Sequence, residues 1–171
     1  NSNTLTSLTQ TIKSWPVIAL ATIGLNCLTG QLAKALDWPL PDQAQMEAVK
    51  AMIGWNLQFL IVAVQVIVVM PAIEEFLFRF PTRFFTRHRY WAWAVLSAVF
   101  SFAHYIDYQA LARGVFTLMP LNVAFLALFF FGFAQCWLYK KTNIWCAILN
   151  HGLFNATNLV LLLIVPESWQ I

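Results

Sequence analysis

The sequence predicts an all-α fold: a polytopic transmembrane bundle of about five membrane helices. Hydrophobic residues make up 60% of the 171 residues and charged residues only 10%. An average soluble domain carries about 45–50% apolar and about 25% charged residues. A soluble core of this size could not bury so much apolar surface. The chain also holds eight Trp and fifteen Phe, which suits helices that face lipid and end at its interfaces.

Five apolar runs are candidate membrane helices, since a helix needs roughly 20 apolar residues to cross a bilayer. The first run is the weakest, because Asn26, Gln31 and Lys34 interrupt it, and the third is short. Polar or basic connections separate the runs, at 37–50, 80–90, 106–119 and 140–143. The predicted helices cover residues 15–36, 51–78, 91–105, 120–139 and 144–165.

Basic residues are distributed unevenly between the predicted loops. With five crossings, Lys13, the stretch 79–90 and Lys140–Lys141 fall on one side. Cytoplasmic loops of membrane proteins are rich in Lys and Arg, so we expect a cytoplasmic N-terminus and a C-terminus on the opposite side. We expect a single integral membrane domain, residues 1–171. Nucleic acid is not an expected partner, because the net charge is only +3 and the chain has no basic run with interleaved exposed aromatic residues.

Ionisable residues inside the apolar runs are the strongest functional signal. A charged side chain at the bilayer centre costs at least about 2.5–3.5 kcal/mol, so it normally faces a cavity or a partner. Glu75 and Arg79 are spaced i, i+4, which puts them on one helix face, where they can pair. Glu74 points about 100° away around the helix and is left without a local cation. A lone carboxyl group in apolar surroundings suits acid–base chemistry.

Two histidines and an asparagine complete the polar set. His104 lies on the third predicted helix, and His151 and Asn155 lie i, i+4 on the fifth. A single histidine on an apolar helix is often structural. Measured from the basic residues at about 1.5 Å per residue, however, Glu74, His151 and His104 lie at depths of about 14, 15 and 22 Å. Their similar depths favour one polar chamber within the bilayer, open to the cytoplasm.

Three ordered motifs carry a family resemblance. EEFLFR at 74–79, FSFAH at 100–104 and HGLFN at 151–155 resemble the EExxxR, FxxxH and HxxxN motifs of the CPBP intramembrane proteases. This family comprises CAAX proteases and bacteriocin-processing enzymes and is also called the Abi family; the resemblance is to its Rce1-like members. It covers roughly residues 66–160, the expected catalytic core. Each motif alone is weak, but all three in order on separate membrane helices are specific.

The resemblance implies a role for each matching residue. Glu74 would activate water together with His104, and His151 and Asn155 would stabilise the oxyanion. Glu75, Arg79 and Phe100 would be supporting residues. Amide hydrolysis needs such a base and such donors. Some descriptions of the family treat the histidines as metal ligands, so a Zn²⁺ held by Glu74, His104 and His151 stays open. The sequence lacks the compact HExxH spacing, so a metal is not demanded.

The resulting prediction is an intramembrane endopeptidase whose partners are the lipid bilayer and a peptide or protein substrate. It would cut a prenylated C-terminus, a leader peptide or a membrane-anchored substrate. An alternative is a non-proteolytic scaffold, assembly or immunity subunit that keeps the protease fold within a larger membrane complex. An ion-coupled transporter is a weaker third reading, since no inverted repeat is visible. Phe80 and Pro81 follow the motif arginine where family members often carry Gly, which makes this point a candidate for altered specificity.

Overall fold

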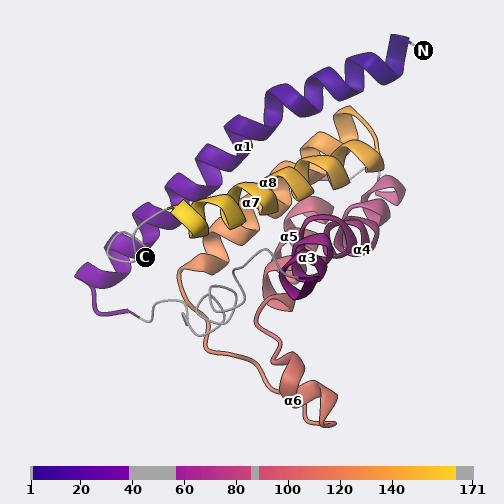
Figure 1. Ribbon diagram of the computed structural model, residues 1–171. Coiled ribbons are helices and arrows are strands. Elements are labelled where there is room, and N and C mark those ends of the chain that lie inside the picture. Colours follow the sequence, from indigo (N-terminus) through magenta and orange to yellow (C-terminus); the bar gives the residue numbers. More distant parts are fainter. Residues whose placement is uncertain (1, 39–56, 86–88, 165–171) are drawn as a thin grey trace.

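The computed structural model describes residues 2–38, 57–85 and 89–164 (Figure 1). Within these ranges the chain is helical, and its only β-type pairing is an isolated bridge between Ile106 and Leu118. The predicted all-α fold is confirmed. Most of the predicted 37–50 loop, the first six residues of the predicted 51–78 helix and the middle of the 80–90 connection lie outside the described residues.

The helices largely follow the predicted order, with one short addition in the 106–119 loop. They are α1 Ser2–Ala35, α3 Leu57–Val64, the π-helix η1 Gln65–Val69, α4 Met70–Phe78, the 3₁₀ helix η2 Phe80–Phe84, α5 Arg89–Ala103, α6 Tyr108–Ala112, α7 Ala124–Lys141 and α8 Ile144–Ile164.

Helix α1 begins well before the predicted start at residue 15. Its early polar side chains are compatible with a helix because they bond to carbonyls of the preceding turn. The Thr11 hydroxyl donates to the Ser7 carbonyl at 3.0 Å, and the Ser14 hydroxyl donates to the Thr11 carbonyl at 3.1 Å. Both side chains are buried. The predicted helix starts too late because the prediction followed hydrophobicity alone.

The second apolar run is one continuous helix with a π-helical segment at its centre. The backbone N–H of Met70 bonds to the Gln65 carbonyl, which closes the wide π turn. Pro71 comes next and has no N–H to continue that pattern. The carbonyl of Val66, five residues before Pro71, is therefore left to a donor from elsewhere. π-Helical turns inside α-helices frequently occur at functional sites.

The helices pack around α7 and α8. Helix α7 contacts both α1 and α5, and α8 contacts α1 on one side and η1 and α4 on the other. Figure 1 shows α8 running beside α1, with the α7–α8 turn at the end of the bundle that holds the N-terminus. The segment with α6 projects from the opposite end (Figure 1). The arrangement brings α4, α5 and α8, which carry the three motifs, to one region.

A cluster of apolar side chains fills the space between α1, α5 and α7. Ile18, Phe100 and Phe131 form its buried centre, and Phe78 and Phe154 pack against them. A separate polar contact joins α1, α7 and α8. The Gln135 side-chain amide donates to the Asn150 Oδ1 at 2.8 Å, and Asn150 in turn lies 3.4 Å from the Ser14 hydroxyl.

Three helices among the described residues are long and apolar enough to cross a membrane. They are Thr4–Ala35, Leu57–Phe84 and Ile144–Leu162. The helix Tyr90–Ala103 is apolar but shorter, and α7 carries Lys140 and Lys141 in its last turn. The outer face of α3 and α4 exposes large apolar side chains such as Leu57, Ile61 and Ile73, as expected for contact with lipid. These features indicate an integral membrane protein. Its five membrane crossings stay a prediction.

Gly132 sets the approach of α7 to α5, which gives a test of this packing. A Cβ at Gly132 would lie 3.1 Å from the Ser97 Cβ and 3.2 Å from Phe100, whereas a Cβ at Gly24 in α1 would meet nothing within 4 Å. Both Gly→Ala changes gain helix propensity of about 0.5–1 kcal/mol. We expect Gly24→Ala to raise the free energy of unfolding and Gly132→Ala to lower it by about 1 kcal/mol through overpacking. Thermal unfolding in detergent measures both, and equal stability of the two variants would contradict the described α5–α7 contact.

Candidate active site

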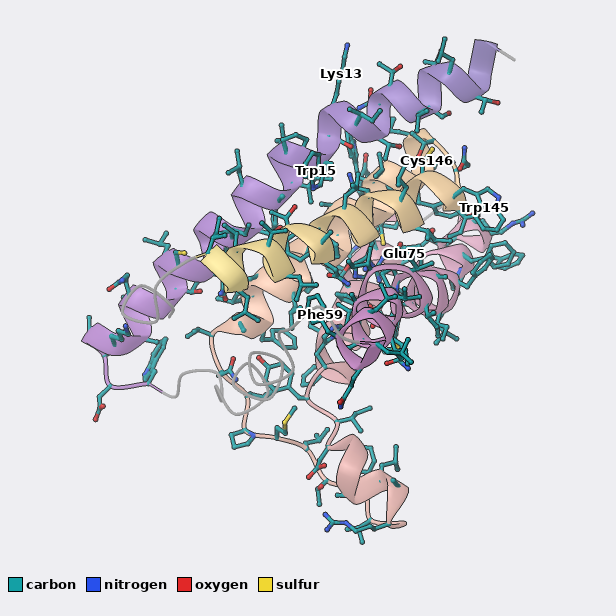
Figure 2. The ribbon with its side chains drawn as sticks, viewed as in Figure 1. Lys13, Trp15, Phe59, Glu75, Trp145 and Cys146 are labelled. Atoms are coloured by element: carbon teal, nitrogen blue, oxygen red, sulfur yellow. The ribbon has the colours of Figure 1, made fainter. Side chains whose placement is uncertain are left out.

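His151 lies between the two adjacent glutamates of α4. Its Nδ1 is 2.9 Å from the Glu75 Oε1 and its Nε2 is 3.6 Å from the Glu74 Oε2. The imidazole is almost fully buried, the Glu75 side chain is completely buried, and the Glu74 side chain is 15% exposed. Figure 2 shows Glu75 where α4 meets α8. Each ring nitrogen of His151 thus faces one carboxylate, and Glu74 is the carboxylate that remains accessible.

Glu75 is fixed from its other side by Arg79. The Arg79 Nε lies 3.3 Å from the Glu75 Oε2, and both side chains are fully buried. The guanidinium carbon of Arg79 also lies 4.2 Å from the centroid of the Phe100 ring, within cation–π range. The predicted pairing of Glu75 with Arg79 is therefore present, and Phe100 supports the cation.

This contact with Glu75 determines which nitrogen of His151 faces Glu74. A carboxylate can only accept hydrogen bonds, so the Nδ1 of His151 must carry a proton to donate to Glu75. The other ring nitrogen, Nε2, faces the Glu74 carboxylate at 3.6 Å. Such a partner on one ring nitrogen commonly fixes the tautomer of a functional histidine. Arg79, Glu75, His151 and Glu74 form a continuous polar chain.

The HGLFN motif docks on the π-helical segment through its second and last residues. The Asn155 side-chain amide donates to the Val66 carbonyl at 2.8 Å, which is the carbonyl that Pro71 cannot serve. A Cβ placed on Gly152 would overlap the carbonyl oxygen of Ile67. Only glycine therefore allows α8 to approach η1 so closely. Since His151 directly precedes Gly152, this contact determines where the imidazole lies relative to α4.

Aromatic rings surround the imidazole. The His151 ring centroid lies 4.9 Å from that of Phe131 and 6.2 Å from that of Phe100, and Phe131 stacks on Phe154 at 4.3 Å. These rings keep water away from one side of the polar chain. In such low-dielectric surroundings, interactions between charged groups are stronger than in water.

His104 packs against Phe100. Its ring centroid is 4.6 Å from that of Phe100, and its Nδ1 is 2.9 Å from the Phe100 carbonyl. Because a carbonyl only accepts, the Nδ1 of His104 carries a proton in this contact. The side chain is exposed. Within the described part of the chain, no hydrogen bond or ion pair joins His104 to Glu74.

Glu74 is predicted to lack a local cation, and the residue that faces it comes from another helix. Helical geometry indicates that Arg79 pairs with Glu75, but it does not reveal a partner from a distant helix. That partner is His151, which comes from α8 through the close approach at Gly152. The sequence contains two signals for this contact, the glycine beside His151 and the proline that disrupts helical bonding before Glu74.

The residues proposed as zinc ligands do not assemble in this arrangement. Among the described residues, there is no group of three or more His, Cys, Asp or Glu side chains that could hold a metal ion. Glu74 and His151 approach each other, whereas the described contacts of His104 are with Phe100. The site does not fit a three-ligand zinc centre, and no step below is routed through a metal.

Comparison with known proteins gives one match. The family model described as type II CAAX prenyl endopeptidase, Rce1-like, matches residues 56–157. This range includes the π-helical segment, both glutamates, His104, His151 and Asn155. No curated protein and no solved structure matches the chain.

The bond between Asn155 and Val66 can be tested through Pro71. Asn155→Ala leaves the Val66 carbonyl without its donor, and we expect this to lower the free energy of unfolding by about 1 kcal/mol. Pro71→Ala supplies a new backbone N–H to the same stretch of helix. The loss in the free energy of unfolding should therefore be smaller in the double variant than the sum of the two single losses, by about 0.5–1 kcal/mol.

Asn158→Ala serves as the matched control, because Asn158 lies on α8 but is exposed. Its effect should add to that of Pro71→Ala without coupling. Unfolding in detergent is measured for the wild type, for each single variant and for each double variant with Pro71→Ala. These measurements give the coupling energy of Pro71 with Asn155 and that of Pro71 with Asn158. Equal coupling at Asn155 and Asn158 would show that Asn155 does not compensate for the missing N–H of Pro71.

Proposed function

Because the chain belongs to the Rce1-like family of type II CAAX prenyl endopeptidases, we propose that it cuts prenylated C-terminal peptides within the membrane, using a water molecule activated by Glu74. The observation that carries the proposal is the paired arrangement of Glu74 and His151, with 3.6 Å between the Glu74 Oε2 and the His151 Nε2. Glu74 is the partly accessible member of an otherwise buried polar chain, so it is the group that water and substrate can reach.

The chemistry of hydrolysis assigns the proton transfers. Glu74 removes a proton from water as the water oxygen bonds to the carbonyl carbon of the substrate. The proton is held between Glu74 and the Nε2 of His151, whose Nδ1–H stays on Glu75. The tetrahedral intermediate then collapses. The C–N bond breaks, and the leaving amine takes the proton from the Glu74–His151 pair, so that the site returns to its starting state.

Two further groups are proposed to assist. The Asn155 amide has two N–H groups, and one of them is bonded to the Val66 carbonyl. The second is available to the oxyanion. The His104 side chain is exposed and is proposed to orient the water or the substrate. Both assignments rest on the family motifs and on the hydrogen-bond partners described above.

The proposed substrate ends in the sequence C-a-a-X, in which a prenyl group is attached to the cysteine. Such an anchor holds the peptide at the membrane surface. The peptide chain then has to enter the helix bundle to reach a carboxylate that lies between α4 and α8. We propose that the cut follows the prenylated cysteine and releases the three residues after it.

Replacing each glutamate in turn distinguishes an effect on catalysis from an effect on the stability of the fold. Glu74→Gln should lower kcat for a prenylated C-a-a-X peptide by about 10²–10⁴-fold, the usual contribution of a general base, with little change in stability. Glu75→Gln should also lower activity, but it leaves the buried Arg79 cation without its partner and should cost about 3–5 kcal/mol in the free energy of unfolding. Peptide cleavage followed by mass spectrometry and thermal unfolding of purified protein measure the two effects.

Cleavage by Glu74→Gln at the wild-type rate would remove Glu74 as the base. If the wild-type protein cuts none of the prenylated peptides and purifies in a fixed ratio with a larger membrane complex, the scaffold or assembly role is favoured instead.

A further inference from the structure

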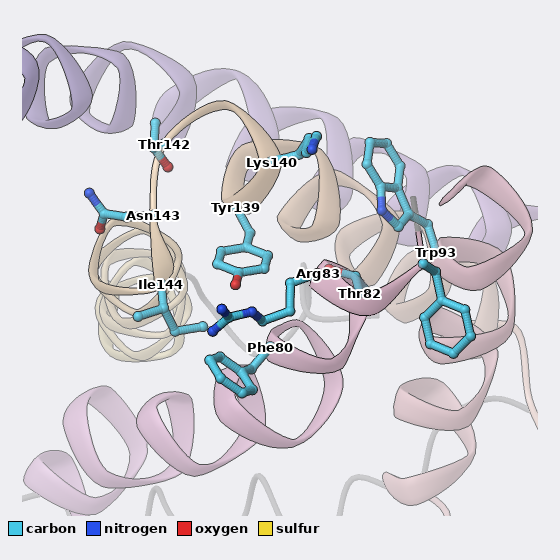
Figure 3. Close-up of a pocket in the computed structure, with 10 residues that line it drawn as sticks. Phe80, Thr82, Arg83, Trp93, Tyr139, Lys140, Thr142, Asn143 and Ile144 are labelled. Atoms are coloured by element: carbon cyan, nitrogen blue, oxygen red, sulfur yellow. The ribbon is translucent and has the colours of Figure 1, made fainter. Parts of the chain in front are cut away.

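A second polar site lies at the end of the bundle where η2, the last turn of α7 and the first turn of α8 meet. It is a pocket of about 470 Å³, lined by residues that include Phe80, Arg83, Tyr139, Lys140 and Ile144 (Figure 3). Nothing in the proposed hydrolysis uses this pocket. It is distinct from the buried contact of His151 with the glutamates, although the same helices α4 and α8 lead to both.

The charge of the pocket is one-sided. Its lining within the described residues holds two cations, Arg83 and Lys140, and no carboxylate. The lining also includes the hydroxyl group of Tyr139 and the side chains of Thr142 and Asn143. Two cations in a lining without a carboxylate favour an anionic ligand, and a guanidinium group matches the geometry of a carboxylate or phosphate.

The direction of Arg83 follows from the residues that depart from the family pattern. Pro81 is the second residue of the 3₁₀ turn η2, and the Thr82 hydroxyl donates to the Arg79 carbonyl at 2.6 Å. This tight turn brings the Arg83 guanidinium carbon to 4.9 Å from the centroid of the Phe80 ring. Figure 3 shows Arg83 extending between Tyr139 and Phe80 toward Ile144. Phe80 and Pro81 therefore position the Arg83 cation at the pocket.

The spacing along α8 between the pocket and His151 is compatible with the length of a three-residue peptide. Ile144 lines the pocket, and His151 follows it seven residues later on α8, a separation of about 10 Å at about 1.5 Å per residue. Three residues of an extended peptide span about 10 Å at about 3.3 Å each. In a C-a-a-X substrate, three residues follow the cysteine and the last one carries the terminal carboxylate.

We propose that this pocket binds the C-terminal carboxylate of the substrate through Arg83 and Lys140, so that the peptide bond after the prenylated cysteine lies beside Glu74 and His151. The inference rests on the proposed function, because the distance argument needs both the cut position and the peptide ending. By binding the carboxylate at this position, the pocket would select peptides whose free carboxylate lies three residues beyond the cut. The site would also oppose longer peptides, whose carboxylate would lie beyond its reach.

Peptide binding tests the pocket without relying on turnover. Two prenylated C-a-a-X peptides are compared, one with a free C-terminal carboxylate and one with a carboxamide. Their affinities are measured by fluorescence anisotropy with Glu74→Gln protein in nanodiscs of zwitterionic phosphatidylcholine. The carboxylate peptide should bind at least about tenfold more tightly, since a hydrogen-bonded charge is removed in the carboxamide. In Arg83→Gln and Lys140→Gln this ratio should fall to near one.

Lys141→Gln is the matched control, because it removes the same charge from the neighbouring residue, which does not line the pocket. This variant should keep the ratio. Equal binding of the two peptides, or the same loss in Lys141→Gln as in Lys140→Gln, overturns the proposal. If Arg83→Gln weakens both peptides alike, and only in nanodiscs that contain anionic phosphatidylglycerol, the pocket holds a lipid phosphate and the proposal is wrong.

Cleavage assays on the same peptides separate this inference from the proposed function. Wild-type protein that cuts both peptides with equal kcat/KM would support the protease and overturn the carboxylate site. Absence of cleavage, combined with carboxylate binding that depends on Arg83, would overturn the proposed function and support the pocket. We expect kcat/KM to be at least about tenfold higher for the carboxylate peptide than for the carboxamide peptide, mainly because the carboxylate peptide has the lower KM.

Discussion

The close docking of α8 on the π-helical segment is the contact on which the rest of the site depends. Pro71 deprives the helix of an N–H, and Asn155 supplies the missing donor to the Val66 carbonyl at 2.8 Å. Gly152 allows the two backbones to approach at Ile67. A local defect in one helix thus becomes the attachment point of another. Because His151 and Gly152 are adjacent, the same contact places the imidazole between two glutamates.

The polar chain that results would be unstable in any looser packing. Arg79, Glu75 and His151 are almost completely removed from solvent, and a buried charge without a partner costs several kcal/mol. Each group of the chain contacts the next, and Phe100 lies under the guanidinium group. Glu74 is the partly accessible end of this chain, whereas both Nη atoms of Arg79 are buried without a hydrogen-bond partner among the described residues. A buried polar chain with one reachable carboxylate is compatible with the proposed hydrolysis inside a membrane.

The sequence predicted the helical class, the order of the helices and the Glu75–Arg79 pair, because each depends on composition or on spacing within one helix. It did not predict the partner of Glu74, because helix packing decides which face of α8 meets α4. Depth along the helices predicts a chamber that His104 shares with Glu74 and His151, and this stays a prediction. The structure places the His104 ring against Phe100, a contact that depends on the rotation of α5 and that depth alone does not specify. Phe80 and Pro81 were visible as a departure, yet their effect on Arg83 needs the geometry of the turn.

The nitrogen-15 NMR spectrum of the histidine side chains tests the central claim most directly. The chain holds only three histidines, and His151→Gln identifies the signals of that residue. The account predicts a protonated, hydrogen-bonded Nδ1 in His151 and an Nε2 signal that moves in Glu74→Gln while the Nδ1 signal stays. An unprotonated Nδ1 in the resting protein, or an Nε2 signal that does not respond to Glu74→Gln, would contradict the paired arrangement of Glu74 and His151.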